Sequence, residues 1–335
     1  MPLAVEIREL VVRYPTPTGD VVAVDGLNLA IATGTVCTLL GPNGAGKTST
    51  VETLEGYRKP TTGIVRVLDL NPISDAKALA PRIGVMLQRN GVYVTMTPRE
   101  VMRLFASYYG TRALNADDML DRVGLSQVSA TPWRRLSGGE QQRLSLGLAL
   151  IGRPDVAFLD EPTASVDPNA RILVRDIIGQ LRTDGVSVVL TTHDLDEAQR
   201  LSDHIVIIDH GKVLAEGTPT ELMQGSGRGG IRFRTPGQFD LHALSLALGG
   251  TVSEGSAGEY LVDVDPSPAH VAALTTWLAQ HNLAIEDLKA GTHSLEDVFL
   301  RLTATAQSAR ADADSALLGP GSSTGRRSRR KEGRS

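Results

Sequence analysis

The sequence predicts an α/β fold with a mostly parallel sheet, followed by a small α+β module. Through the first two thirds of the chain, short runs of β-branched and aliphatic residues alternate with helical patterns, which is typical of strands buried on both faces of a parallel sheet. After residue 230 the expected order becomes strand–helix–strand–strand–helix–strand, the ferredoxin-like split arrangement. The clearest runs of the first part cover residues 35–41, 82–88, 155–161, 186–193 and 204–213.

The bulk composition is that of an ordinary globular protein. The chain has 335 residues, 41% of them hydrophobic and 21% charged, which is enough for one large domain and a smaller one. A net charge of −4 gives no general argument for nucleic-acid binding. The single cysteine, Cys37, excludes an internal disulfide and fits a reducing compartment. No apolar run approaches the roughly 20 residues that span a bilayer, so we expect the chain to dock on a membrane protein rather than to cross the membrane.

The first of these strands runs into a glycine-rich loop, GPNGAGKTS, which precedes a helical pattern. Its spacing, Gly-x₄-Gly-Lys-Thr, is that of a P-loop, in which backbone N–H groups and the start of the helix surround phosphate oxygens. We expect Lys47 to reach the β- and γ-phosphates of a nucleotide and the Thr48 hydroxyl to bind Mg²⁺. The predicted nucleotide-binding residues are Gly41, Pro42, Asn43, Gly44, Ala45, Gly46, Lys47, Thr48 and Ser49.

Polar residues end the later strands, and the carboxyl ends of parallel strands share the edge where ligands bind. We expect Asp160 to hold Mg²⁺ through a water molecule. The adjacent Glu161 is predicted to orient the attacking water and accept its proton. His193 is predicted to donate a hydrogen bond to the γ-phosphate. Gln88 either contacts Mg²⁺ or the water, or is an ordinary surface residue.

Residues 89–154 read as a helical subdomain inserted into the sheet domain. Thr97–Glu100 has the pattern of a capping box with proline at the first helical position. Further on, LSGGE places a serine and two glycines where another helix begins, and such a helix start can also bind phosphate. The predicted residues of this second phosphate-binding motif are Ser137, Gly138, Gly139 and Glu140. A carboxylate at Glu140 is unfavourable beside polyphosphate unless it points away or finds a cation.

Tyr14 precedes these motifs, and two interpretations of it stand side by side. Its ring either stacks on adenine, a contact worth roughly 1–3 kcal/mol in single-stranded nucleic-acid complexes, or packs on the sheet at the end of a strand.

The ordered set GPNGAGKTS, Gln88, LSGGE, VAFLDEPTASVD and TTH closely resembles the nucleotide-binding subunit of ATP-binding cassette (ABC) transporters over roughly Val5–Leu222. The resemblance implies that two such subunits pack head to tail, so that the P-loop of one faces the Ser137–Glu140 signature of the other across ATP. It also implies that Asp167 belongs to a D-loop that touches the opposite subunit. The family usually has glutamine at the position of Glu140, and TASVD replaces its commoner TSGLD.

The ending SLEDVFLRLT, residues 294–303, resembles that of ATPases serving ABC-2-type exporters of drugs and antibiotics. We therefore expect an exporter ATPase that uses ATP and Mg²⁺. Its expected partners are a second, identical ATPase subunit and ABC-2-type permease subunits, and we expect no nucleic-acid binding. The chain should lie at the cytoplasmic face of the membrane. The alternatives are an ABC importer ATPase and, with less support, a soluble ABC ATPase acting on nucleic acid or ribosomes. The resemblance also implies that the membrane subunits select the transported molecule, so this sequence does not identify it.

These patterns divide the chain into four parts. We expect a nucleotide-binding domain over residues 1–223, a linker over 224–230, a ferredoxin-like domain over 231–304 and a disordered basic tail over 305–335. The arginines of the tail either contact anionic lipid or are simply solvated, and we favour the second interpretation.

Overall fold

The computed structural model describes residues 2–17, 19–86, 92–164, 166–224, 230–255, 258–291 and 294–303. The predicted linker, the basic tail and Gln88 therefore lie largely or wholly outside the described residues. Within the described part, no helix is both long enough and apolar enough to cross a membrane.

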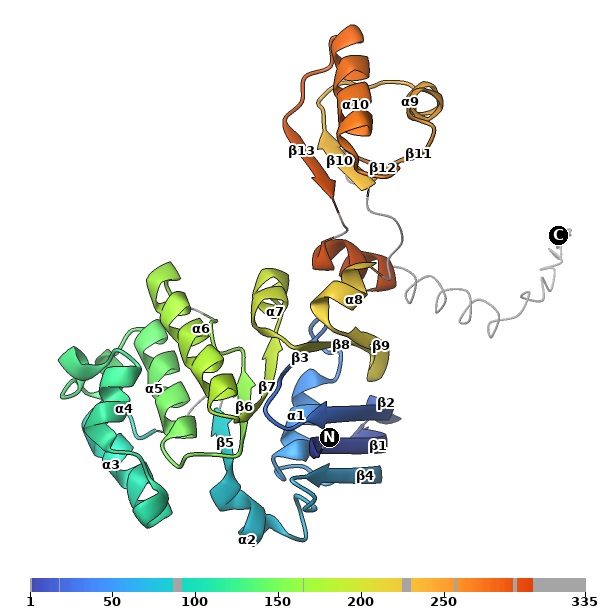
Figure 1. Ribbon diagram of the computed structural model, residues 1–335. Coiled ribbons are helices and arrows are strands. Elements are labelled where there is room, and N and C mark those ends of the chain that lie inside the picture. Colours follow the sequence, from blue (N-terminus) through green and yellow to red (C-terminus); the bar gives the residue numbers. More distant parts are fainter. Residues whose placement is uncertain are drawn as a thin grey trace, which may run out of the picture.

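A six-stranded sheet forms the centre of the first part, in the order β5-β6-β7-β3-β8-β9 (Figure 1). The first five strands pair in parallel and β9 is antiparallel to β8. The mostly parallel sheet is as predicted, but the run 204–213 is two strands joined by a turn at His210 and Gly211, both with positive φ. The strands are β3 (Val36–Leu40), β5 (Ile83–Met86), β6 (Val156–Asp160), β7 (Ser187–Thr192), β8 (His204–Asp209) and β9 (Lys212–Gly217).

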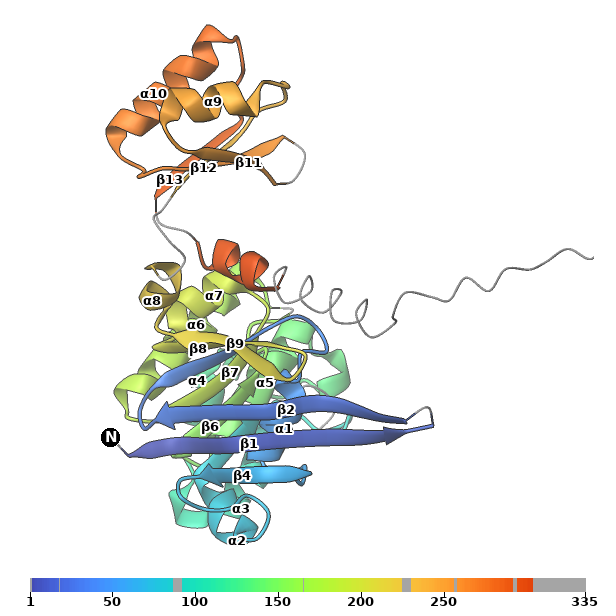
Figure 2. The ribbon, with the colours of Figure 1, turned by 90° about the vertical axis from the view of Figure 1, so that its right-hand side faces the viewer.

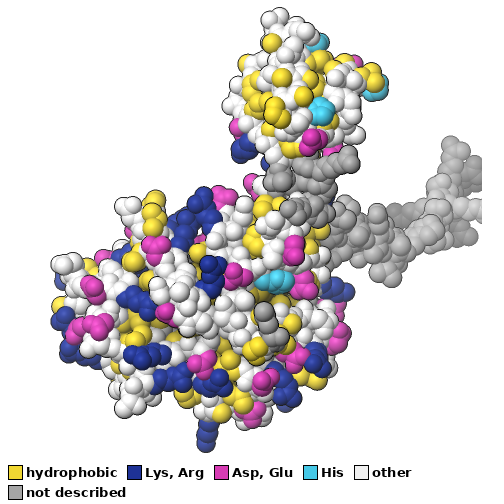
Figure 3. All heavy atoms as spheres, viewed as in Figure 1, with side chains coloured by type: hydrophobic (Ala, Val, Ile, Leu, Met, Phe, Trp, Pro, Cys, Tyr) yellow, Lys and Arg dark blue, Asp and Glu magenta, His cyan; other side chains and the backbone are white. Residues whose placement is uncertain are grey.

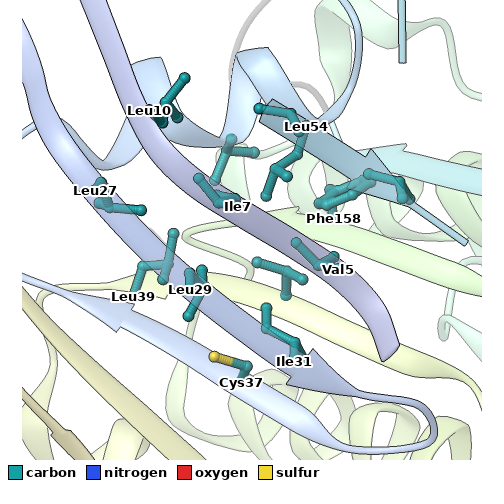
Figure 4. Close-up of a cluster of buried hydrophobic side chains, with 14 of the residues drawn as sticks. Val5, Ile7, Leu10, Leu27, Leu29, Ile31, Cys37, Leu39, Leu54 and Phe158 are labelled. Carbon is teal, nitrogen blue, oxygen red and sulfur yellow. The ribbon is translucent and has the colours of Figure 1, made fainter. Parts of the chain in front are cut away.

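A second, antiparallel sheet, which the sequence patterns had not predicted, packs on one face of the first. It has the order β2-β1-β4, with β1 (Leu3–Thr16), β2 (Gly19–Ala32) and β4 (Thr62–Val67). Figure 4 shows its apolar side chains facing those of β3, and Cys37 lies among them. Burial raises the pKa of Cys37 to about 12, with a smaller effect from Glu216, so this thiol is an inert part of the core.

Most of the helices cover the opposite face of the central sheet (Figures 1 and 2), whereas α1 packs on the same face as the antiparallel sheet. The predicted capping box is present at the start of α3, where Thr97 and Glu100 satisfy each other's backbone N–H groups. Helices α3, α4 and α5 pack together beside β5 and form the helical region expected over residues 89–154. The helices are α1 (Lys47–Leu54), α2 (Ala76–Leu79), α3 (Pro98–Tyr109), α4 (Ala116–Arg122), α5 (Gly138–Leu150), α6 (Pro168–Thr183), α7 (Leu195–Leu201) and α8 (Pro219–Gln224).

Residues 230–291 form a separate unit, which we call the accessory module; it stands on the side of α7 and α8 (Figure 1). Its four antiparallel strands have the order β11-β12-β10-β13, which is the ferredoxin-like order. An aromatic group of Phe233, Phe239, Tyr260 and Trp277 fills its own core. The elements are β10 (Gly230–Arg234), α9 (Leu241–Leu248), β11 (Thr251–Glu254), β12 (Glu259–Asp263), α10 (Pro268–Gln280) and β13 (Asp287–Gly291).

We expected the last described residues, 294–303, to pack in this module, but they pack on the nucleotide-binding part of the chain instead. Residues 295–303 are helical, and Leu295 and Val298 are buried against α7, α8, β3 and β8 rather than against the four-stranded sheet. This segment, the terminal helix, is the unlabelled red helix beside α8 in Figure 1.

Candidate nucleotide site

The loop after β3 is shaped so that only glycine fits at two of its positions. A Cβ atom at Gly41 would lie 2.2 Å from the carbonyl oxygen of Ile208, and one at Gly46 would lie 2.4 Å from that of Ala23. Gly46 also has φ of 103° and starts α1. The chain therefore closes tightly around the space at the start of α1, as a phosphate loop requires.

Lys47 lies inside this loop with only 9% of its surface exposed. Its Nζ donates to the carbonyl oxygens of Gly41 at 2.7 Å and Pro42 at 3.1 Å. Burial lowers the pKa of Lys47, while the carboxylates of Glu161 and Asp160 act in the opposite direction. These two hydrogen bonds hold its ammonium group at the loop.

A cavity of about 400 Å³ joins the loop to both Tyr14 and the acids. The Tyr14 hydroxyl lies 2.8 Å from Ser49 Oγ, and the Arg58 guanidinium lies 4.3 Å from the centre of the Tyr14 ring. The ring also packs against the core, so both interpretations of Tyr14 find support in its surroundings. The cavity is lined by Tyr14, Val21, Ala23, residues 43–49, Asp160 and Glu161.

The ends of β6 and β7 bring the predicted acids and histidine together. Asp160 accepts a hydrogen bond from the Thr191 hydroxyl and faces the cavity. Glu161 has a φ of 47°, a left-handed conformation that is uncommon outside glycine, and its N–H donates to the Thr191 carbonyl oxygen at 3.0 Å. Its Oε1 lies 2.9 Å from His193 Nδ1. Glu161 and His193 therefore form a hydrogen-bonded pair beside the P-loop.

The Ser137–Glu140 segment lies elsewhere. Ser137 caps α5, its backbone N–H donates to the Glu140 carboxylate at 2.7 Å, and its hydroxyl donates to the same carboxylate at 2.9 Å. Ser137 and Glu140 thus form a capping box at the start of α5, in which the Glu140 carboxylate is held by Ser137. Residues 137–140 are absent from the described lining of the nucleotide cavity.

Several side chains around the site were missed by sequence reasoning because their residue types are unremarkable in their local patterns. Gln142 of α5 donates to the Glu161 carbonyl oxygen at 2.8 Å, which ties α5 to the end of β6. Buried Glu197 accepts from Thr163 at 2.5 Å and from Thr192 at 3.2 Å, and burial raises the pKa of its carboxyl group. Asp167, by contrast, was named by the sequence as a D-loop residue; it caps α6 through the N–H groups of Asn169 and Ala170, with 62% of its side chain exposed.

A P-loop with buried Lys47, two acids at the end of β6 and a histidine directly after β7 lie at one edge of the sheet, a combination typical of a nucleoside triphosphatase. The family model described as "ABC transporter" matches residues 24–164. The daunorubicin resistance ATP-binding protein DrrA3 of Streptomyces coeruleorubidus is 35% identical to this chain, over 85% of the chain and 92% of that protein. The Nod factor export ATP-binding protein I of Ralstonia nicotianae is 33% identical, over 85% of the chain and 90% of that protein.

Solved structures agree on the fold. An ATP-binding cassette determined as a dimer in a post-hydrolysis state, with ADP and phosphate, superimposes with a TM-score of 0.60 at 24% identity, over 64% of this chain and 98% of that one. The chain belongs to the ATP-binding subunits of ABC transporters, and it is an ATPase. Because these relatives are named for resistance and export, they favour the exporter interpretation over the importer and the soluble alternatives.

Proposed function

We propose that this chain hydrolyses ATP as one half of a head-to-tail pair of cassettes and thereby drives an ABC-2-type permease that exports a drug-like or antibiotic-like compound. The observation that carries the proposal is the lining of the nucleotide cavity. It holds the P-loop, Asp160 and Glu161, but it leaves the Ser137–Glu140 segment on another part of the surface. A second copy, placed head to tail, supplies that segment to the open side of the site.

The residues of the cavity suit the chemistry of ATP hydrolysis. Thr48 and Asp160 offer a hydroxyl and a carboxylate oxygen, which fit Mg²⁺ bound mainly by phosphate oxygens. Such an ion would neutralise charge that develops on the phosphates. Lys47 binds the phosphates, and Glu161 accepts the proton of the attacking water. His193 binds both Glu161 and the γ-phosphate and so fixes their relative positions. Gln88 keeps its proposed place at Mg²⁺ or the water, outside the described residues.

In this proposal the permease docks in a groove beside the helical region, and the chain works at the cytoplasmic face of the membrane. This groove, of about 340 Å³, lies between the end of α1 and helix α3. Tyr57 lines it with 68% of its surface exposed, and Phe105 and Tyr109 line the opposite side. Aromatic walls of this kind favour an apolar segment of a partner.

The proposal is tested by co-expressing the chain with an ABC-2-type permease subunit from the same organism. Phe105→Glu places a charge in the groove, whereas Leu104→Glu places one on the same helix outside the described lining of the groove. We expect Phe105→Glu to lower the recovered permease roughly tenfold or more, as for a buried interface residue, and Leu104→Glu to lower it little. Equal recovery with both variants would place the permease elsewhere. In lipid vesicles, the wild-type complex should show ATPase activity stimulated by the exported compound.

Glu55 lies at the edge of this groove and makes the stability of the chain depend on pH. Burial raises its pKa from 4.5 to about 8, and the charges of Asp160 and Glu52 add to the effect. The folded state keeps the proton over a range where the unfolded state has released it, so this group lowers the free energy of unfolding as pH rises from about 4.5 to about 8.

We expect Glu55→Gln, which stays neutral, to raise the unfolding midpoint by a few degrees at pH 8 and by almost nothing at pH 4.5. Thermal unfolding followed by circular dichroism measures both values, with Glu286→Gln on an exposed loop as the control. An equal effect of Glu55→Gln at the two pH values would refute the assignment.

A further inference from the structure

The terminal helix, residues 295–303, has the sequence LEDVFLRLT, which the proposed chemistry does not use. Its apolar residues recur at positions 295, 298, 299 and 302, the spacing of one helical face. Leu295 is 1% exposed and Val298 is 3% exposed. They pack in one cluster with Leu40, Ala198, Ile205, Ile207 and Leu222. The helix therefore belongs structurally to the ATPase core.

Two residues of this cluster lie close in the chain to the proposed catalytic groups. Leu40 is the last residue of β3, immediately before the P-loop, and Ala198 lies on α7, the helix that follows His193. Leu195, at the start of α7, also packs against the cluster. The position of α7, and with it the loop that presents His193, depends on this contact.

Phe299 extends from the same helical face to the site itself. A second cavity, of about 380 Å³, lies beside the nucleotide cavity and shares Asn43 and Glu161 with it. Its lining combines the P-loop, the Glu161–His193 pair and Phe299. A phenyl ring more than a hundred positions from the other catalytic motifs thus forms part of the wall next to the general base.

The terminal helix is also tied to the accessory module. Asp297 caps the helix by accepting from the Ser294 N–H and hydroxyl, each at 2.9 Å. The same carboxylate forms an ion pair with Arg232 of β10, an inner strand of the module's sheet. Both side chains are largely buried, with 28% of Arg232 and 17% of Asp297 exposed. A movement of the module would therefore act on the terminal helix at its first turn.

We propose that Phe299 is a positioning residue for ATP hydrolysis, through which the accessory module controls the catalytic pair. Phe299 lines the cavity that borders the Glu161–His193 pair, and it packs against the cluster that contains Leu195 and Ala198 of α7, so that it keeps α7 and the loop with His193 in place. The Arg232–Asp297 ion pair transmits the position of the module to this ring. The inference rests on the proposed roles of Glu161 and His193.

The test compares Phe299→Ala, Phe299→Leu and Leu300→Ala in the full-length chain. Leu300 lies on the same helix but is 56% exposed, so Leu300→Ala serves as the matched control. We expect Phe299→Ala to lower kcat for ATP hydrolysis roughly tenfold to a hundredfold, as for misplaced catalytic groups. The KM and the dissociation constant of a fluorescent ATP analogue should change less than about twofold, because the nucleotide cavity is intact. Phe299→Leu should recover most of kcat and Leu300→Ala should match the wild type.

Arg232→Met tests the link to the module, because it breaks the ion pair but leaves the helix cap in place. It should lower kcat in the same direction, and combining it with Phe299→Ala should add little further loss. The inference is overturned if Phe299→Ala keeps the wild-type kcat, or if its loss disappears at temperatures well below its unfolding midpoint. Glu161→Gln in parallel separates the two ideas: an inactive Glu161→Gln beside a fully active Phe299→Ala refutes only the role of Phe299, whereas an active Glu161→Gln refutes the proposed chemistry.

Discussion

Glu161→Gln should bind ATP with nearly unchanged affinity and hydrolyse it about 10²- to 10⁴-fold more slowly than the wild type, the range over which a general base contributes. The amide keeps the size of the side chain and its contact with His193 Nδ1, at 2.9 Å in the wild type, but it cannot accept the proton of the attacking water. Bound ATP then persists, so the paired form should accumulate.

Phosphate release measures the rate, and size-exclusion chromatography with light scattering measures the paired form with and without ATP. Glu286→Gln, far along the sequence in the accessory module, is the matched carboxylate-to-amide control. Turnover near the wild-type rate in Glu161→Gln would remove Glu161 from the role of base.

Ser137→Arg should have an effect of similar size for a different reason. The nucleotide cavity of the same chain has no described contact with Ser137, so the isolated variant should bind ATP as the wild type does. The long charged side chain blocks the surface that receives the partner's nucleotide, and ATP hydrolysis should fall by roughly a hundredfold or more. Loss of the serine cap costs about 0.5–2 kcal/mol of stability, so the unfolding midpoint is measured alongside. A variant that binds ATP, stays folded and still turns over at full rate would contradict the proposed shared site.

The sequence predicted much of this site because its motifs depend on local chemistry. The P-loop follows from the spacing of Gly41, Gly46 and Lys47, and its tight contacts with Ile208 and Ala23 confirm that glycine is required there. The meeting of Asp160, Glu161 and His193 follows from a general property of parallel sheets, whose carboxyl ends share one edge. These parts of the prediction needed no knowledge of which elements pack together.

The parts that failed or were missed depend on long-range packing. The antiparallel β2-β1-β4 sheet was missed because a half-exposed hairpin gives a weaker signal than a buried strand. The face of the terminal helix was visible as an apolar period, but the period does not say which surface covers it. Phe299, Gln142 and Arg58 reach the site from helices or loops distant in the sequence or ordinary in type, so no spacing could assign them.

The central claim is that each ATP is held between the P-loop of one chain and the Ser137–Glu140 segment of another, and a mixing experiment tests it most directly. Lys47→Ala and Ser137→Arg chains are purified separately, shown to be inactive, and then mixed in equal amounts. Random pairing makes half of the pairs mixed, and each mixed pair contains one intact site, so the mixture should recover up to about a quarter of the wild-type ATPase rate. A mixture no more active than the sum of its two components, despite paired chains in solution, would contradict the claim.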